Sequence, residues 1–123
     1  MASKSAHLEQ AGHNEALRSS IPDTHPDWEI TTIFYTALHY LRAHLAGLGA
    51  RYTGNDLRYD LLSHFLRLEG LSELVRPFDL LRDLSYETRY GCRTMGWNYS
   101  QMTDAERALE RIKKRLLELG EVN

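Results

Sequence analysis

A stripe of polar and aromatic side chains could form one wall of a binding cleft. It consists of Trp28, Thr32, Tyr35, His39 and Arg42, which recur at intervals of four, three, four and three residues. This spacing places all five on one face of a helix. An imidazole titrates near neutral pH and a guanidinium binds anions, so His39 and Arg42 could act together on an anionic ligand. The alternative is that Tyr35 and His39 pack at a seam between helices, with neighbouring helices satisfying their polar ends.

Arginines and tyrosines are interleaved in a second segment. Arg82, Arg89 and Arg93 are separated by seven and four residues, and Tyr86 and Tyr90 lie between them. Arginine beside aromatic rings is suited to clamp phosphates and to stack on bases. We therefore predict an anion-binding surface that includes Arg82, Arg89 and Tyr90. The alternative is that carboxylates of the same helix neutralise these arginines as ordinary ion pairs.

The residue pattern does not favour a metal or another cofactor. A two-metal helical bundle needs repeated Glu-x-x-His pairs, and the sequence contains none. His39 and His44 are five residues apart, about 140° around a helix, and so cannot chelate one ion as i and i+4 histidines do. The single cysteine, Cys92, cannot form an internal disulfide, which is typical of a reducing compartment. We predict a cytoplasmic protein without a metal or other cofactor.

The composition is that of one small globular domain. The chain has 123 residues, of which 42% are hydrophobic and 26% charged, and we predict a single domain over residues 1–123. The net charge of -2 creates no overall field toward polyanions, so any contact with nucleic acid must be local. The longest apolar stretch, residues 33–41, is interrupted by Thr36 and His39. It is too short to cross a bilayer, and we predict no membrane segment.

Hydrophobic periodicity predicts helices along the whole chain. The last helix carries a Thr103-x-x-Glu106 capping box at its start and Gly120 at its end. No stretch shows sustained alternation with β-branched residues, and the only long connection runs over residues 91–102. These features predict an all-α, up-and-down bundle of four or five helices. The predicted helices cover residues 4–20, 26–48, 55–70, 72–91 (or 77–91) and 103–120.

Two segments resemble those of the HEPN-domain proteins, a family of small helical proteins. Residues 26–28 (Pro-Asp-Trp), leading into 34–39 (Phe-Tyr-Thr-Ala-Leu-His), are similar to the second helix of these proteins, where a Phe-Tyr-x-Ala-x-His type segment recurs. Residues 81–90 (Leu-Arg-Asp-Leu-Ser-Tyr-Glu-Thr-Arg-Tyr) are similar to the Arg-x-x-Ala-Asp-Tyr type segment before their last helix. With helix order and length, the resemblance covers nearly the whole chain. It implies an HEPN-like up-and-down bundle, commonly a homodimer.

The resemblance also implies a catalytic pair. Many HEPN relatives are metal-independent ribonucleases, often toxins or defence proteins, whose signature is an arginine followed after four to six residues by a histidine, lining a cleft at the dimer interface. Arg58 and His64 match this signature with five residues between them. In that role His64 would move a proton at the ribose 2′-hydroxyl or the leaving oxygen, and Arg58 would stabilise the phosphorane-like charge.

Two functions of different classes follow from the sequence. The first is an HEPN-like homodimer that acts on or with RNA or nucleotides as a metal-independent endoribonuclease. The second is a non-catalytic HEPN-like module that binds a protein partner, such as a nucleotidyltransferase. A small-molecule enzyme is a weaker third reading. The residues assigned to catalysis are Arg58 and His64, and those assigned to substrate binding are Tyr35, His39, Arg42, Arg82, Arg89 and Tyr90.

Overall fold

Helices account for nearly all of the described chain. The computed structural model describes residues 3–48, 59–91 and 96–120, and these ranges contain no strand. The all-α prediction is therefore confirmed. No helix in these ranges is both long and apolar enough to span a membrane. The elements are α1 (Lys4–Arg18), α2 (Pro26–Ala46), α3 (Tyr59–Leu68), the short 3-10 helix η2 (Ser72–Leu74), α4 (Val75–Tyr90) and α5 (Tyr99–Glu118).

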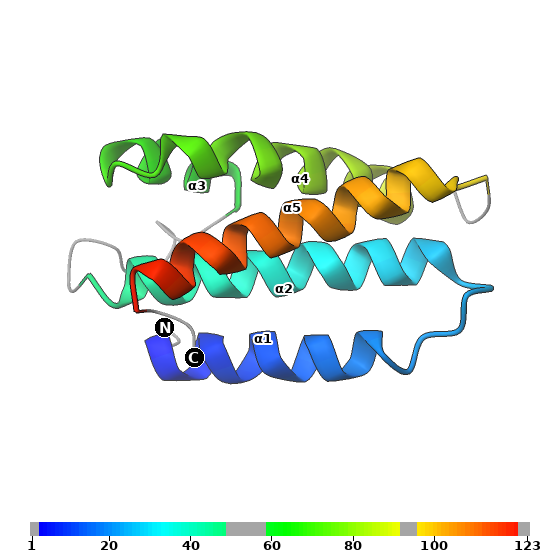
Figure 1. The fold of residues 1–123 in the computed structure, drawn as a ribbon, viewed down its shortest axis with the longest axis horizontal. Helices are drawn as coiled ribbons and strands as arrows, with labels where there is room; N and C mark the ends of the chain where they lie inside the picture. The colour runs from blue at the N-terminus through cyan, green and yellow to red at the C-terminus, as the bar shows by residue number, and fades with distance from the viewer. Residues whose placement is uncertain (1–2, 49–58, 92–95, 121–123) are drawn as a thin grey trace.

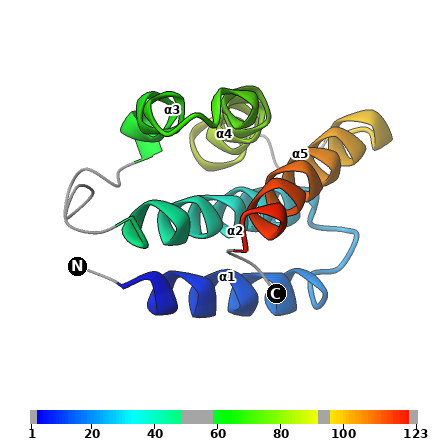
Figure 2. The same ribbon diagram turned by 60° about the vertical axis from the view of Figure 1, so that its left-hand side comes forward.

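Helix α2 lies at the centre of the fold. It packs against α1, α4 and α5, with α1 on one side, α3 and α4 on the opposite side and α5 crossing between these layers (Figures 1 and 2). Because α2 is enclosed by three helices, even its threonines are buried. The Oγ1 hydroxyl of Thr36 donates to the carbonyl oxygen of Thr32 at 2.8 Å, which satisfies the polar group inside the core.

The apolar core joins all five helices. The rings of Phe34 and Phe78 stack with their centroids 5.9 Å apart and connect α2 to α4. Each fully buried side chain of this size stabilises the fold by about 1.5–3 kcal/mol relative to exposure. The hydrophobic stripes predicted along residues 30–48 and 105–119 are buried except at their last members, since Leu48 is 41% exposed and Leu119 is 39% exposed. The members of the core include Ala11, Ile33, Phe34, Leu38, Leu41, Leu62, Leu66, Phe78, Leu81, Leu109, Ile112 and Leu116.

The start of α5 differs from the prediction. The helix begins at Tyr99, with Asn98 as its N-cap, rather than at Thr103. The Oδ1 atom of Asn98 accepts from the backbone N–H of Gln101 at 2.8 Å, and Oε1 of Gln101 accepts from the backbone N–H of Asn98 at 3.2 Å. This reciprocal pair satisfies donors at the end of the helix one turn earlier than the Thr103 box would. The connection after α4 is therefore shorter than predicted and runs over residues 91–98.

The buried face of α1 also differs from the prediction. The hydrophobic pattern of Leu8, Ala11 and Leu17 predicts the inner face of this helix; Ala11 is buried as predicted, but Leu17 is 50% exposed. The buried residues of α1 are His7, Ala11 and Asn14. These three residues follow the i, i+4, i+7 spacing of one helix face, and this face packs against α2. The remaining boundaries agree with the prediction within a few residues, except that the predicted start of the third helix at residue 55 lies outside the described residues.

One carboxylate ties three helices together. Glu15 of α1 accepts a hydrogen bond from the hydroxyl of Tyr40 in α2 at 2.8 Å through Oε2. Its Oε1 atom lies 2.7 Å from the Nζ atom of Lys113 in α5. Burial raises the pKa of the Tyr40 hydroxyl, and its hydrogen bond to Glu15 raises that pKa further. Tyr40 therefore stays a donor, and the contact fixes α1 against the α2–α5 layer.

Candidate functional site

The guanidinium of Arg89 is held in a fixed position between α4 and α2. Its Nε donates to the Oγ of Ser85 at 3.0 Å, and its Nη1 donates to the hydroxyl of Tyr35 at 3.3 Å. The centre of the guanidinium lies 5.2 Å from the ring centroid of Phe34 and 5.0 Å from that of Tyr90. Aromatic faces attract a cation at these distances. Hydrogen bonds and rings together therefore orient Arg89 before any ligand binds.

Pairing between α2 and α4 brings these residues together. The Oγ1 atoms of Thr31 in α2 and Thr88 in α4 are in hydrogen-bonding contact, so the beginning of α2 lies beside the end of α4. Thr88 also donates to the carbonyl oxygen of Ser85 at 2.8 Å. This junction places Tyr35, one turn further along α2, within reach of Arg89. We call the surface formed by Tyr35, His39, Arg42, Arg89 and Tyr90 the α2–α4 face.

His39 pairs with a histidine of α1. The Nδ1 atoms of His7 and His39 lie 3.0 Å apart, and the two ring centroids are 5.3 Å apart. One Nδ1 must carry the proton and the other must accept it. The ring that donates from Nδ1 then has an acceptor at Nε2, and the other ring has a donor there. Neutral His7 and His39 together thus present one proton acceptor and one proton donor.

The environment of the histidine pair keeps both rings neutral at neutral pH. Burial, with smaller contributions from the positive charges of His7 (when protonated) and Arg42, lowers the pKa of His39 from 6.5 to about 4. Burial also lowers the pKa of His7, with a smaller contribution from Arg42. A protonated ring would lose hydration and face a second cation. A neutral imidazole beside a guanidinium is a combination that can accept a proton while a nearby anion is bound.

Two tyrosines give the α2–α4 face an exposed aromatic edge. Tyr86 is 60% exposed and Tyr90 is 62% exposed, and their ring centroids are 5.1 Å apart. Aromatic rings are enriched in contact surfaces, because burying them in a complex releases water from a large apolar area. Tyr90 lies beside Arg89, which combines a ring that can stack on a base with a cation that can bind a phosphate.

Arg82 is engaged by carboxylates of its own helix. Its Nη2 lies 3.5 Å from Oδ1 of Asp79, and its Nε lies 4.0 Å from Oδ1 of Asp83. These contacts are the ordinary helix ion pairs that the sequence left open as an alternative for this segment. The role of Arg82 in ligand binding stays a prediction. Arg93 lies outside the described residues.

The predicted catalytic pair is not part of the α2–α4 face as described. His64 lies on α3 with an exposed side chain, and its ring centroid is 5.5 Å from that of Phe65. Within the described ranges it forms no hydrogen bond or ion pair. Arg58 lies outside the described residues. A catalytic role for Arg58 and His64 therefore stays a prediction from the sequence.

Sequence reasoning missed two members of the site. Ser85 is fully buried and accepts from Arg89, and His7 is the partner of His39. The spacing of His7, Ala11 and Asn14 was the available signal for His7, since it marks an alternative inner face of α1. Two of its three members are polar, so hydrophobic periodicity does not mark this face.

Comparison with known proteins identifies no relative. The chain matches no protein-family model, no curated protein and no solved structure. The HEPN resemblance therefore depends on the sequence segments alone. Among the described residues, no group of three or more His, Cys, Asp or Glu side chains is arranged to hold a metal ion.

Proposed function

We propose that this chain is an HEPN-like domain that binds single-stranded RNA or nucleotides on the α2–α4 face. The observation that carries the proposal is the position of Arg89, which is oriented by Ser85 and Tyr35 and stands against the exposed ring of Tyr90. Fixing a guanidinium in advance lowers the entropy that a ligand must remove on binding. A phosphate on Arg89 and a base on Tyr90 are the two contacts that this arrangement offers.

The histidine pair and Arg42 extend the proposed site along α2. Arg42 interacts electrostatically with His7, His39 and Tyr35. Burial lowers the pKa of its guanidinium, which stays positively charged at neutral pH. A second phosphate near Arg42 would lie beside a neutral imidazole. The local charge of this face, rather than the net charge of -2, supplies the attraction.

Fluorescence anisotropy with a labelled oligouridylate tests this proposal. We expect saturable binding by the wild-type protein, competition by adenosine monophosphate, and about tenfold weaker binding after Arg89→Gln or Tyr90→Ala, since one stacked base contributes about 1–3 kcal/mol. The matched control is Arg67→Gln, which removes an exposed arginine from α3. Equal effects of Arg67→Gln and Arg89→Gln would contradict a localised site.

A cleavage assay without divalent metal separates binding from catalysis. The resemblance predicts that wild-type protein cuts RNA and that His64→Ala abolishes cutting while binding persists, because His64 lies on α3 outside the α2–α4 face. Cutting that depends on His39 instead would move the catalytic role to the histidine pair. Intact RNA with wild-type protein would leave the domain as a binding module.

The same proposal includes a homodimer, which the HEPN resemblance implies. Sedimentation equilibrium distinguishes a dimer of twice 14.2 kDa from the monomer. A monomer at all concentrations tested would remove the dimeric cleft from the proposal and leave the α2–α4 face as the site within one chain.

A further inference from the structure

A groove between α4 and α5 is lined by three arginines, two of which form no ion pair among the described residues. Its volume is about 320 Å³, and its lining includes Arg76 of α4 and Arg107 and Arg111 of α5. All three side chains are exposed. Within the part of the chain that the structure describes, Arg76 and Arg107 form no ion pair, and Arg111 has an electrostatic partner in Glu73. The groove is therefore a site where negative charge would be favoured.

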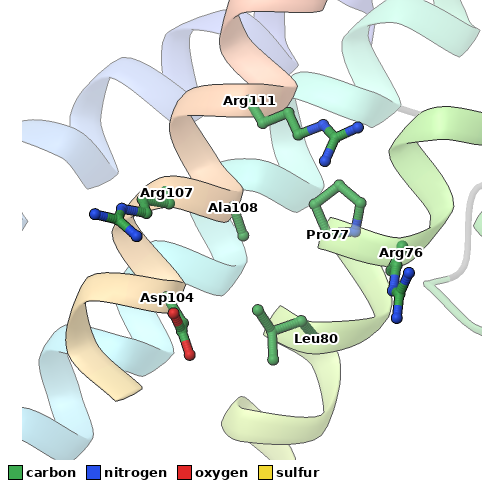
Figure 3. Close-up of a pocket in the computed structure, with 7 residues that line it drawn as sticks. All are labelled: Arg76, Pro77, Leu80, Asp104, Arg107, Ala108 and Arg111. Carbon is green, nitrogen blue, oxygen red and sulfur yellow. The ribbon is translucent and has the colours of Figure 1, made fainter. Parts of the chain in front are cut away.

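The floor of the groove is apolar. It is made by Pro77 and Leu80 of α4 and Ala108 of α5. Figure 3 shows Leu80 reaching toward α5 and Arg111 extending from α5 toward Pro77. Leu80 is 38% exposed, so an apolar side chain of the groove stands open to solvent. Covering this side chain would remove apolar area from water, which favours binding of a ligand that itself carries an apolar group.

The positive charge continues along α5. A second hollow of about 210 Å³ shares Arg111 with the groove and adds Lys114, together with Arg115, which pairs with the two carboxylates of this hollow, Glu73 and Glu118. Arg107, Arg111 and Lys114 are separated by four and three residues, which places them on one face of the helix over a rise of about 10 Å. Asp104 is the one carboxylate among the described residues that line the first groove. The ligand that fits is therefore elongated and carries several negative charges along one side.

We propose that this α4–α5 groove binds an acidic amphipathic segment of a protein partner. Aliphatic side chains of the segment would cover Leu80, and its carboxylates would pair with Arg76, Arg107 and Arg111. A helix that lies in a groove between two helices uses this combination of apolar anchors and flanking charges. The described residues that line the two hollows include no aromatic ring. Nucleobases would find no stacking surface there, which favours a peptide over RNA.

This inference is independent of the proposed RNA site. The groove is lined by the first turns of α4 and by α5, whereas Arg89 and Tyr90 lie at the end of α4. A substitution can therefore disrupt one site and leave the other intact. Arg89→Gln is expected to weaken RNA binding and to leave peptide binding unchanged, so failure of one proposal does not imply failure of the other.

The test uses a fluorescein-labelled peptide about 14 residues long, which spans about four helical turns. Its leucines follow a three- and four-residue spacing, and glutamates occupy the remaining positions. Anisotropy is expected to show saturable binding that Arg111→Glu weakens by about tenfold or more, since reversing a charge replaces attraction with repulsion. Arg67→Glu on α3 is the control, because it makes the same change of charge at an exposed site away from the groove.

A second variant tests the floor of the groove. Leu80→Ser removes the apolar contact without changing charge, and we expect it to weaken binding of the peptide by about three- to tenfold. Because Leu80 is partly exposed, this variant keeps the test valid even if Arg111→Glu perturbs folding, which circular dichroism would reveal.

Three results would overturn the proposal. These are absence of saturable peptide binding, equal effects of Arg111→Glu and Arg67→Glu, and full binding by Leu80→Ser. An oligouridylate that displaces the peptide and depends equally on Arg111 would assign the groove to nucleic acid instead of a protein partner.

Discussion

His7 and His39 share a hydrogen bond between their Nδ1 atoms at 3.0 Å, although they are 32 positions apart in the chain. The contact joins α1 to the central helix beside Arg42. A doubly protonated pair would place two cations against each other and against this guanidinium. The fold therefore depends on neutral imidazoles at this point.

Acidification should weaken the fold through this pair. Because burial lowers the pKa of His39 from 6.5 to about 4 in the folded protein, the unfolded chain binds the proton more readily between these values. The contribution of this pair to the free energy of unfolding is therefore fully present above pH 6.5 and is lost as the pH falls toward 4. The loss should reach about 1–3 kcal/mol. Urea unfolding at several pH values measures it.

Matched variants isolate the contribution of the pair. His39→Asn should flatten the dependence of the unfolding free energy on pH between 6.5 and 4. His64→Asn, a change at an exposed histidine of α3, should leave that dependence unchanged. Parallel curves for the wild-type and His39→Asn proteins would show that the histidine pair does not control acid stability.

Replacing Glu15 should loosen α1. Glu15→Ala leaves the buried hydroxyl of Tyr40 without its acceptor and Lys113 without its carboxylate. We expect a loss of about 1–3 kcal/mol in the free energy of unfolding, because an unsatisfied buried donor carries a desolvation cost. Thermal and urea unfolding measure it. Glu9→Ala, at an exposed position of the same helix, should change stability by less than about 0.5 kcal/mol.

The cap of α5 provides a local test of the helix boundary. Asn98→Ala removes the side chain that accepts from the backbone N–H of Gln101 and should cost about 1 kcal/mol. Thr103→Ala lies inside the helix, where alanine has the higher propensity, and should be neutral or slightly stabilising. The reverse order of the two effects in urea unfolding would place the helix start at Thr103.

Tyr35 should act as a positioning residue for Arg89. Tyr35→Phe removes the hydroxyl that accepts from Nη1 of Arg89 while keeping the ring. We expect oligouridylate binding to weaken several-fold, because the guanidinium loses one of its orienting contacts, with the helical content unchanged by circular dichroism. Unaltered RNA affinity would mean that Ser85 and the rings orient Arg89 sufficiently.

Local patterns in the sequence predicted the central helix but not its partners. Helix α2 has a complete hydrophobic stripe and a proline at its first turn, so both its extent and its inner face were predictable. For α1, the predicted stripe of Leu8, Ala11 and Leu17 competed with the face of His7, Ala11 and Asn14, which shares only Ala11 with it. Only packing against α2 decides which face is buried.

Contacts between helices were also unpredictable at the candidate site. The stripe of Tyr35 and His39 could be predicted because both lie on one helix. Their contacts with Arg89 and His7 join residues 54 and 32 positions apart, and helical periodicity carries no information on such pairs. The prediction for the start of α5 was wrong for a different reason. Two possible capping sequences follow one another in the chain, and the first of them, which begins at Asn98, caps the helix.

Photo-crosslinking tests the central claim most directly. A single-stranded RNA that contains 4-thiouridine is irradiated in complex with the protein, and the attached peptides are identified by mass spectrometry. Binding on the α2–α4 face predicts attachment at Tyr86 or Tyr90, with loss of that attachment after Arg89→Gln. Attachment confined to α3 or α5, and unaffected by Arg89→Gln, would contradict the account.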